Sequence, residues 1–137
     1  MIGSMTPFRI SFAGGGSDLR AFYKDNLGCV VSTTIDKHMY LFVHPSFDQK
    51  IQVKYSETEL VEKIDELRHP IVREALRILG LSAIDISSIA DIPAGTGLGS
   101  SSSFTVGLFN ALYGYLGEES TRERLASEAC RLEIDIL

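Results

Sequence analysis

A regular alternation of apolar and polar residues indicates the first strand of the chain. From Thr6 to Ala13 every second residue is apolar, which is typical of a strand buried on one face, here the face of Phe8, Ile10 and Phe12. Arg9 then lies on the opposite face. Glycines at positions 14–16 end the strand, and Ser17 or Asp18 is predicted to cap a short helix after it.

Three more strands are predicted before residue 56. β-branched and aromatic residues are dense at 29–35 and at 37–44, and alternation resumes at Ile51, Val53 and Tyr55. The segment 45–49 holds the turn-forming residues proline, serine and aspartate. A hairpin through this segment is therefore the simplest interpretation.

Helical periodicity appears in the charged region 56–77, where two helices are predicted on either side of His69 and Pro70. Their apolar faces are Leu60, Ile64 and Leu67 in the first, and Val72, Leu76 and Leu79 in the second. Gly80 ends the second helix. A strand containing Ile84, Ile86 and Ile89 is expected next.

Two helices complete the predicted fold. Residues 104–116 are apolar nearly all round, which indicates a helix buried on most sides. Ser120 and Glu123 have the spacing of a capping box for a last helix, whose apolar face is Leu125, Ala129, Leu132 and Ile136. No helix-ending residue precedes Leu137, so we expect the chain to stop inside this helix and to be the N-terminal portion of something longer.

Composition narrows the class of protein. With 137 residues, of which 45% are hydrophobic and 23% charged, the chain is expected to form one globular domain. A net charge of −5 argues against nucleic-acid binding. Cys29 and Cys130 form neither a disulfide framework nor a metal motif, which fits a reducing cytoplasm. There is no export signal, and no apolar run approaches the ~20 residues that span a membrane.

The segment 93–103 carries the clearest chemical signal, with the sequence Pro-Ala-Gly-Thr-Gly-Leu-Gly-Ser-Ser-Ser-Ser. Its glycines allow a tight turn with accessible N–H groups, and its serines begin a helix whose N-terminus attracts anions. A turn that merely packs helix against sheet is the alternative, but it accounts poorly for the serines. A Walker loop is excluded because no Gly-Lys-Ser/Thr is present, and Ser100 stands where a dinucleotide loop needs glycine.

Residues 93–101 resemble the phosphate loop of the galactokinase, homoserine kinase, mevalonate kinase and phosphomevalonate kinase (GHMP) family. The segment 7–18, Pro-Phe-Arg-Ile-Ser-Phe-Ala-Gly-Gly-Gly-Ser-Asp, is similar to the family's first motif, most of all in its heptose-phosphate kinase and fucokinase-like branch. The resemblance runs from Thr6 to the last residue. It implies an α+β fold, a mostly antiparallel sheet with helices packed on one face, as in some ribosomal proteins. It also implies ATP-dependent phosphorylation of a sugar or sugar phosphate, above all a heptose phosphate.

The resemblance further implies roles for individual residues. ATP would be bound by Pro93, Gly95, Thr96, Gly97, Leu98, Gly99, Ser100, Ser101 and Ser102, and Mg²⁺ by Ser101 and Glu133. The sugar would be bound by Gly15, Gly16, Ser17 and Asp18, and Arg9 would act on the transferred phosphoryl group. Phosphoryl transfer asks a protein mainly to position the reactants and neutralise charge, which suits this set.

Less specific interpretations exist for the charged residues and for the function. By pattern alone, Arg9 is a solvated strand arginine, Asp18 a helix cap and Glu133 a surface carboxylate. The family's catalytic aspartate and C-terminal domain would follow Leu137, so this chain is expected to be catalytically incomplete. The alternative function is a non-catalytic nucleotide- or sugar-binding module, or a fragment that binds a partner. RNA binding is disfavoured by the acidity of the chain.

Overall fold

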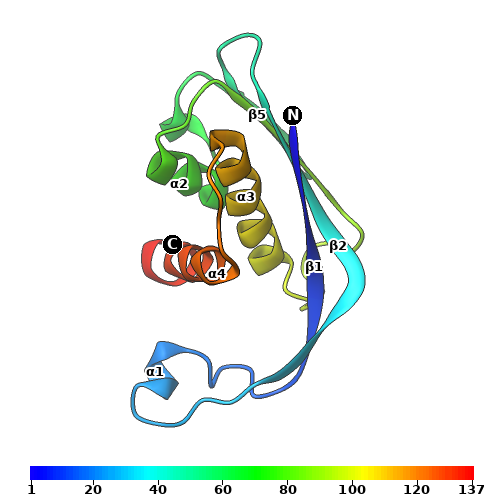
Figure 1. Cartoon of the computed structure of the whole chain (residues 1–137), viewed down its shortest axis with the longest axis vertical. Coiled ribbons are helices and arrows are strands. Elements are labelled where there is room, and N and C mark those ends of the chain that lie inside the picture. Colours follow the sequence, from blue (N-terminus) through cyan, green and yellow to red (C-terminus); the bar gives the residue numbers. More distant parts are fainter.

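A five-stranded sheet with helices on one of its faces makes up the fold (Figure 1). The computed structural model describes every residue from 1 to 137. The strands are β1 (Ile2–Ala13), β2 (Val31–Pro45), β3 (Ile51–Lys54), β4 (Thr58–Val61) and β5 (Ile84–Ala90), in the spatial order β1-β2-β5-β3-β4. Neighbouring strands are antiparallel except β3 and β5, which are parallel. The expected α+β class, with a mostly antiparallel sheet, is confirmed.

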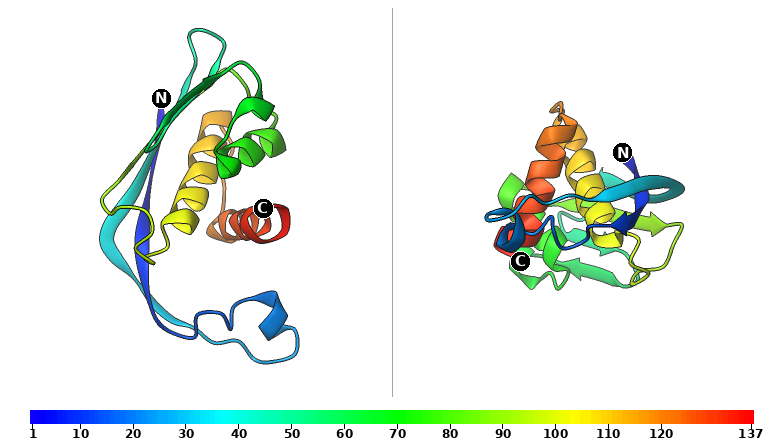
Figure 2. Two further views of the ribbon diagram at one scale, coloured as in Figure 1. Left: turned by 180° about the vertical axis from the view of Figure 1, so that it is seen from behind. Right: turned by 90° about the horizontal axis from the view of Figure 1, so that it is seen from below.

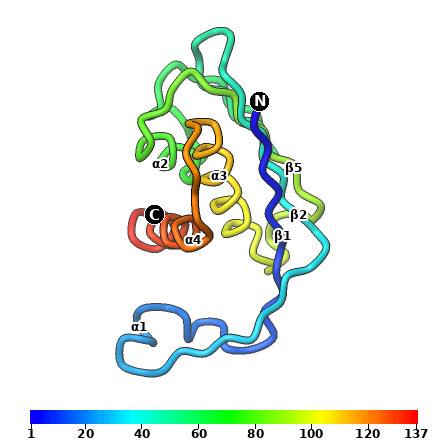
Figure 3. The backbone as a smooth tube through the Cα atoms, viewed as in Figure 1, coloured from blue at the N-terminus to red at the C-terminus, as the bar shows by residue number.

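The helical layer is built around α3, which lies between the sheet and the other large helices (Figure 2). The helices are α1 (Arg20–Tyr23), α2 (Pro70–Leu79), α3 (Ser100–Leu116) and α4 (Arg122–Cys130), with a 3₁₀ turn at Ile64–Glu66 and a π-helical turn at Arg131–Ile136. The segment 14–30, which carries α1, projects away from the rest of the molecule (Figure 3). None of the helices is both long and apolar enough to cross a bilayer.

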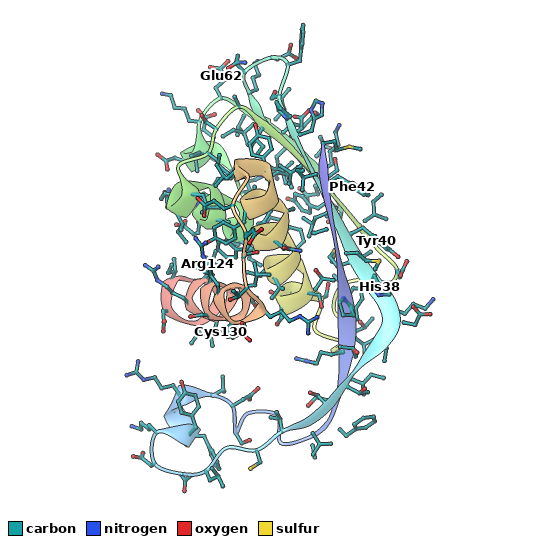
Figure 4. All side chains as sticks on the ribbon, in the orientation of Figure 1. His38, Tyr40, Phe42, Glu62, Arg124 and Cys130 are labelled. Atoms are coloured by element: carbon teal, nitrogen blue, oxygen red, sulfur yellow. The ribbon has the colours of Figure 1, made fainter.

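The core forms where β2 faces α3. Alternate residues of β2, namely Met39, Leu41 and Val43, are buried, whereas the residues between them belong to the opposite face of the sheet, as His38, Tyr40 and Phe42 show in Figure 4. The predicted all-apolar helix is α3, and it is buried on most of its surface. Gly107 of α3 lets the helix backbone approach β1 and β2 closely.

The predicted hairpin through residues 45–49 is wrong. The segments 29–35 and 37–44, predicted as two strands, are joined in the single long strand β2, and β5 lies between β2 and β3. Strands that flank a third strand are only about 10 Å apart. The five residues 46–50 bridge that distance easily, so turn residues here do not require a hairpin.

The first of the two helices predicted in the charged region is also absent. Its place is taken by β4 and the 3₁₀ turn, because Glu59 is turned inward, where its residue is 5% exposed, while Leu60 is 56% exposed. The second helix, α2, forms as predicted and ends at Gly80 with φ +64°.

Two helix caps and one buried position differ from prediction. Leu19 is the N-cap of α1 and provides no side-chain hydrogen bond, so neither Ser17 nor Asp18 caps that helix. Thr121, one residue after the predicted Ser120, caps α4 by accepting from Arg124 N–H. Leu125, Ala129 and Leu132 are buried as expected, but Ile136 is 40% exposed because the π-helical turn shifts it away from the buried side of the helix.

Candidate functional site

The loop between β5 and α3 presents a row of backbone donors. Gly95, Gly97 and Gly99 all have φ between +75° and +82°, a conformation that other residues adopt only with strain. The first backbone donor after the loop is Ser103 N–H, which bonds Gly99 O. No backbone N–H of residues 95–102 donates to a protein acceptor. Because they include the first turn of α3, these groups also carry the positive end of the helix dipole. The loop is therefore suited to an anion.

Arg9 holds the loop against β1. Its backbone N–H donates to Leu98 O across 3.1 Å, and its guanidinium donates to Gly97 O across 3.4 Å. A Cβ atom at Gly99 would lie 3.3 Å from Arg9 Cγ and Cζ, so the arginine stem runs along that glycine. β1 is irregular around Arg9, with register shifts between Pro7 and Arg9 and between Ser11 and Ala13. The shifts allow Arg9 to reach the loop.

Ser101 and Glu133 lie together although they come from different helical segments. The Ser101 hydroxyl donates to Glu133 Oε2 across 2.9 Å, at the N-terminus of α3. Ser101 O also accepts a hydrogen bond from Thr105 Oγ1. Oxygen donors of this kind suit Mg²⁺, which commonly takes one or two protein ligands and completes its shell with water and substrate phosphates. The structure contains no group of three or more His, Cys, Asp or Glu side chains arranged for a metal ion, so this pair is not a complete metal cage.

A cavity of about 680 Å³ opens beside the loop. From the loop and the start of α3 it is lined by Pro93, Gly95, Ser100 and Ser101. Its other wall is aromatic and comes from Tyr55, His69 and Phe104. The cavity therefore reaches from the glycine-rich loop to an aromatic surface, and a volume of this size holds a small organic ligand.

A second cavity, of about 390 Å³, lies on the other side of Arg9. Gly15, Gly16 and Asp18 line it together with Arg9, so the predicted catalytic residue meets three of the predicted substrate-binding residues there. Ser17 does not line it. The Ser17 hydroxyl instead donates to Gly14 O and Cys29 O and accepts from Cys29 N–H, which closes the base of the projecting segment.

The side chains of the other loop residues predicted to bind ATP do not line the larger cavity. Thr96 Oγ1 donates to Pro93 O and closes the turn. Leu98 packs against the core with its side chain, and Ser102 is exposed. Their contribution to an anion site comes from backbone N–H groups rather than side chains.

The aromatic wall and its supporting carboxylate have no counterpart among the residues singled out from the sequence. Tyr55 packs edge-on to His69, with ring centroids 4.8 Å apart, and His69 stacks on Phe104 at 4.9 Å. Behind them Glu59 accepts from Tyr55 Oη at 2.9 Å. No local signal marked Glu59, because residues 58–61 do not alternate, and we interpreted this segment as part of a helix.

Burial governs the protonation of this wall. Burial raises the pKa of Tyr55, and the hydrogen bond to Glu59 adds to the rise. Burial lowers the pKa of His69, against the opposing attraction of Glu59. Burial alone would raise the pKa of Glu59, but hydrogen bonds from Arg68 N–H, Tyr55 and His69 N–H outweigh it, and that pKa is lowered. Near neutral pH the wall consists of a neutral phenol, a neutral imidazole and a carboxylate.

The chain is similar in sequence to a known family and to proteins in it. The model of the GHMP kinases N terminal domain matches residues 59–137, more than half of the chain, including the loop, α3 and α4. The D-glycero-alpha-D-manno-heptose 7-phosphate kinase of Campylobacter jejuni is 26% identical over 147 aligned residues, covering 96% of this chain and 43% of that protein. The mevalonate kinase of Methanothermobacter thermautotrophicus is 44% identical over 55 residues, covering 40% of this chain and 18% of that protein.

The fold matches solved structures as well. The D-glycero-D-manno-heptose 1-phosphate kinase of Bacteroides thetaiotaomicron superposes with a TM-score of 0.84 and 22% identity, over 97% of this chain and 48% of that one. The chain thus spans less than half the length of the heptose phosphate kinases that it matches. With the loop, the Ser101–Glu133 pair and the family match together, we conclude that the chain belongs to the GHMP kinase family, through the family's N-terminal domain.

Proposed function

We propose that this chain is the ATP-binding N-terminal domain of a cytoplasmic kinase that transfers the γ-phosphoryl group of ATP to a sugar phosphate, a heptose phosphate above all. The observation that carries the proposal is the position of Arg9. It contacts the anion-binding loop on one side and lines the cavity of Gly15, Gly16 and Asp18 on the other. A phosphoryl group transferred from a nucleotide at the loop to an acceptor in that cavity would move past the Arg9 guanidinium.

Each part of the arrangement has a role in the proposal. The free N–H groups of residues 95–102 would bind phosphate oxygens, and the larger cavity would hold the nucleoside. Arg9 would hold an oxygen of the transferred phosphoryl group. Asp18 would accept hydrogen bonds from sugar hydroxyls, as would the backbone carbonyls of Gly15 and Gly16. Ser17 would act indirectly, by closing the base of the segment.

The proposed metal site fits the residues present. Ser101 and Glu133 supply a hydroxyl and a carboxylate 2.9 Å apart beside the loop, where the phosphates of a nucleotide would complete the coordination. A bound Mg²⁺ would neutralise charge on the phosphate oxygens. Because the net charge is −5 and Arg9 is the one lysine or arginine that contacts the loop or lines either cavity, such neutralisation is needed there.

The test is ADP release by the protein expressed from the whole reading frame, with heptose 7-phosphate, heptose 1-phosphate, galactose and mevalonate as acceptors. We expect turnover with a heptose phosphate, and losses of at least about a hundredfold in Arg9→Ala and Ser101→Ala. Arg9→Lys is the matched variant for Arg9, because it keeps the charge and loses the planar fork. The 137-residue chain alone should bind Mg·ATP weakly or not at all and release no ADP.

Three outcomes would contradict parts of the proposal. Turnover that survives both Arg9→Ala and Ser101→Ala would contradict the assigned residues. Turnover with mevalonate or galactose alone would contradict the substrate class. Binding of Mg·ATP without ADP release from the full-length protein on any acceptor would favour a nucleotide-binding module instead.

A further inference from the structure

A buried carboxylate lies behind the aromatic wall of the larger cavity without lining the cavity itself. Glu59, on β4, has a side chain that is 3% exposed. Its Oε1 accepts a hydrogen bond from Tyr55 Oη at 2.9 Å and one from the backbone N–H of His69 at 3.0 Å. Its Oε2 accepts a hydrogen bond from the backbone N–H of Arg68 at 2.6 Å. Both oxygens are therefore acceptors for donors on two different segments of the chain.

These hydrogen bonds fix the two residues that shape the wall. Tyr55 follows β3 and His69 precedes α2, and Glu59 joins them through one carboxylate. His69 is further confined between Phe104, which stacks on it, and Tyr55, which packs edge-on. The wall is thus assembled from three separate elements, and Glu59 is the one polar group that bonds to two of them.

The imidazole of His69 has a defined hydrogen-bonding state. Its Nδ1 accepts from Val72 N–H at 3.4 Å and so caps α2, which assigns the ring proton to Nε2 in the neutral form. No protein acceptor receives a hydrogen bond from Nε2. His69 therefore offers the cavity an aromatic ring with a free N–H donor.

The same cavity is lined at its other end by Gly95, Ser100 and Ser101 of the anion-binding loop. A ligand that fills it joins an anionic group at the loop to a flat, apolar group at the wall, and a ring with acceptor atoms would also satisfy Nε2–H. A nucleotide has both parts, because its base is planar and carries ring-nitrogen acceptors. A bare sugar phosphate lacks the planar part.

We infer that Glu59 is a positioning residue for nucleotide binding, which fixes Tyr55 and His69 so that they receive the base of a nucleotide whose phosphates lie at residues 95–102. The inference rests on the proposed function and goes further in assigning the base-binding wall and the residue that orders it. Glu59→Gln is the decisive change, because the carboxamide replaces one of the two acceptors by an NH₂ donor that faces N–H or O–H donors.

The test compares ATP with inorganic tripolyphosphate, which has the phosphates and lacks the base. Both are titrated by NMR, with Mg²⁺, into the protein expressed from the whole reading frame and into its Glu59→Gln, His69→Asn and Glu57→Gln variants. His69→Asn keeps a side chain that can cap α2 and removes the imidazole. Glu57→Gln removes an equal charge from the exposed partner of Arg68, outside the wall, and is the matched control.

Glu59→Gln and His69→Asn should each weaken the binding of ATP about tenfold and leave the affinity for tripolyphosphate unchanged. Glu57→Gln should change neither affinity. In the unmodified chain the His69 ring resonances should shift with ATP and not with tripolyphosphate, and Glu59→Gln should abolish that shift. A purely structural role for Glu59 would not move this signature.

The contrary outcomes separate the inference from the proposed function. Unchanged ATP affinity in both wall variants, or equal losses for ATP and tripolyphosphate, would overturn the role of Glu59 while leaving the loop as an anion site. Binding of tripolyphosphate without any preference for ATP in the unmodified chain would overturn the base-binding wall. If neither compound binds the unmodified chain, the proposed function is overturned and the inference with it.

Discussion

Ser101 donates a hydrogen bond to Glu133 Oε2 across 2.9 Å, and the two residues are 32 positions apart in the chain. One belongs to the first turn of α3 and the other to the π-helical turn that follows α4. The bond brings a carboxylate to the positive end of α3, where the helix dipole favours negative charge. The contact therefore joins the folding of the last helical segment to the chemistry of the anion-binding loop.

Replacement of Glu133 by glutamine should separate these two roles. The carboxamide oxygen can still accept from Ser101, so the free energy of unfolding should change by less than about 1 kcal/mol. The lost charge should abolish the dependence of ATP affinity on Mg²⁺, measured as the ratio of dissociation constants with Mg²⁺ and with EDTA. Asp135→Asn, an exposed carboxylate two residues away, is the control and should keep the dependence. An unaltered ratio in Glu133→Gln would remove Glu133 from the metal site.

Alanine at Gly97 and at Gly99 should have equal costs in stability and unequal effects on Arg9. Both glycines have positive φ, 75° and 78°, so either substitution should cost about 1–2 kcal/mol in urea unfolding. A Cβ at Gly97 meets open space, whereas at Gly99 it lies 3.3 Å from the Arg9 side chain. Gly99→Ala should shift the Arg9 Nε–H resonance more than Gly97→Ala does. No shift in Gly99→Ala, or a larger shift in Gly97→Ala, would mean that Arg9 does not rest on Gly99.

The close approach of α3 to the sheet can be tested with a second pair of glycines. A Cβ at Gly107 would lie 2.8 Å from Leu41 Cδ1 and from Thr6 Oγ1, so Gly107→Ala should destabilise the chain by about 1–3 kcal/mol. A Cβ at Gly114 would have one contact, with Cγ2 of Ile2 at 3.1 Å, where β1 begins. Gly114→Ala should be nearly neutral, because the better helix propensity of alanine offsets a small displacement. Thermal unfolding of both variants checks the difference, and equal stabilities would contradict the packing.

Stability should fall in acid partly because of His69. Its pKa in the folded chain is lowered from 6.5, chiefly by burial, so the unfolded chain binds a proton more readily. The stability that this group contributes is fully present above pH 6.5 and is lost as pH falls from there through the lowered pKa. Urea unfolding at several pH values between 7 and 5 should show this slope, and it should be smaller in His69→Asn.

His44→Asn is the control for that measurement, because His44 is exposed on β2. It should leave the slope unchanged. At still lower pH the carboxylate of Glu59, whose pKa is lowered in the folded chain, should add a further loss as it becomes protonated. A His69→Asn chain with the same slope between pH 7 and 5 as the unmodified chain would contradict the assignment.

Local patterns predicted the elements of this fold better than their pairing. The glycine-rich loop was singled out from its glycine spacing, which is a local signal, whereas Arg9 was singled out only by the family resemblance, because strand alternation alone indicates a solvated arginine. The insertion of β5 between β2 and β3 was missed because turn residues report where the chain bends and not which strand lies alongside. Contacts across long sequence separations decided the pairing, and single-chain periodicity does not record them.

Glu59 illustrates why part of the site escaped prediction. A charged residue is expected at the surface, and in a charged segment nothing marks one glutamate as buried. Its burial depends on donors from Tyr55, Arg68 and His69, which approach only in the folded chain. The closing role of Ser17 was missed for a similar reason, since its partner Cys29 is 12 residues away, and Ser17 was predicted to cap α1 instead.

The base of the projecting segment 14–30 is closed by one side chain. Ser17 bonds both Gly14 and Cys29, and a Cβ at Gly14 would lie 1.9 Å from Cys29 O. The two ends of the segment, at Gly14 and Cys29, are therefore in backbone contact with each other. A segment closed in this way can change in length or sequence beyond Ser17 without moving Arg9, since the bond at its base fixes where β1 stops and β2 starts. Under the proposed function, Asp18 could therefore be exchanged together with the acceptor, while Arg9, Gly15 and Gly16 of the same cavity keep their places.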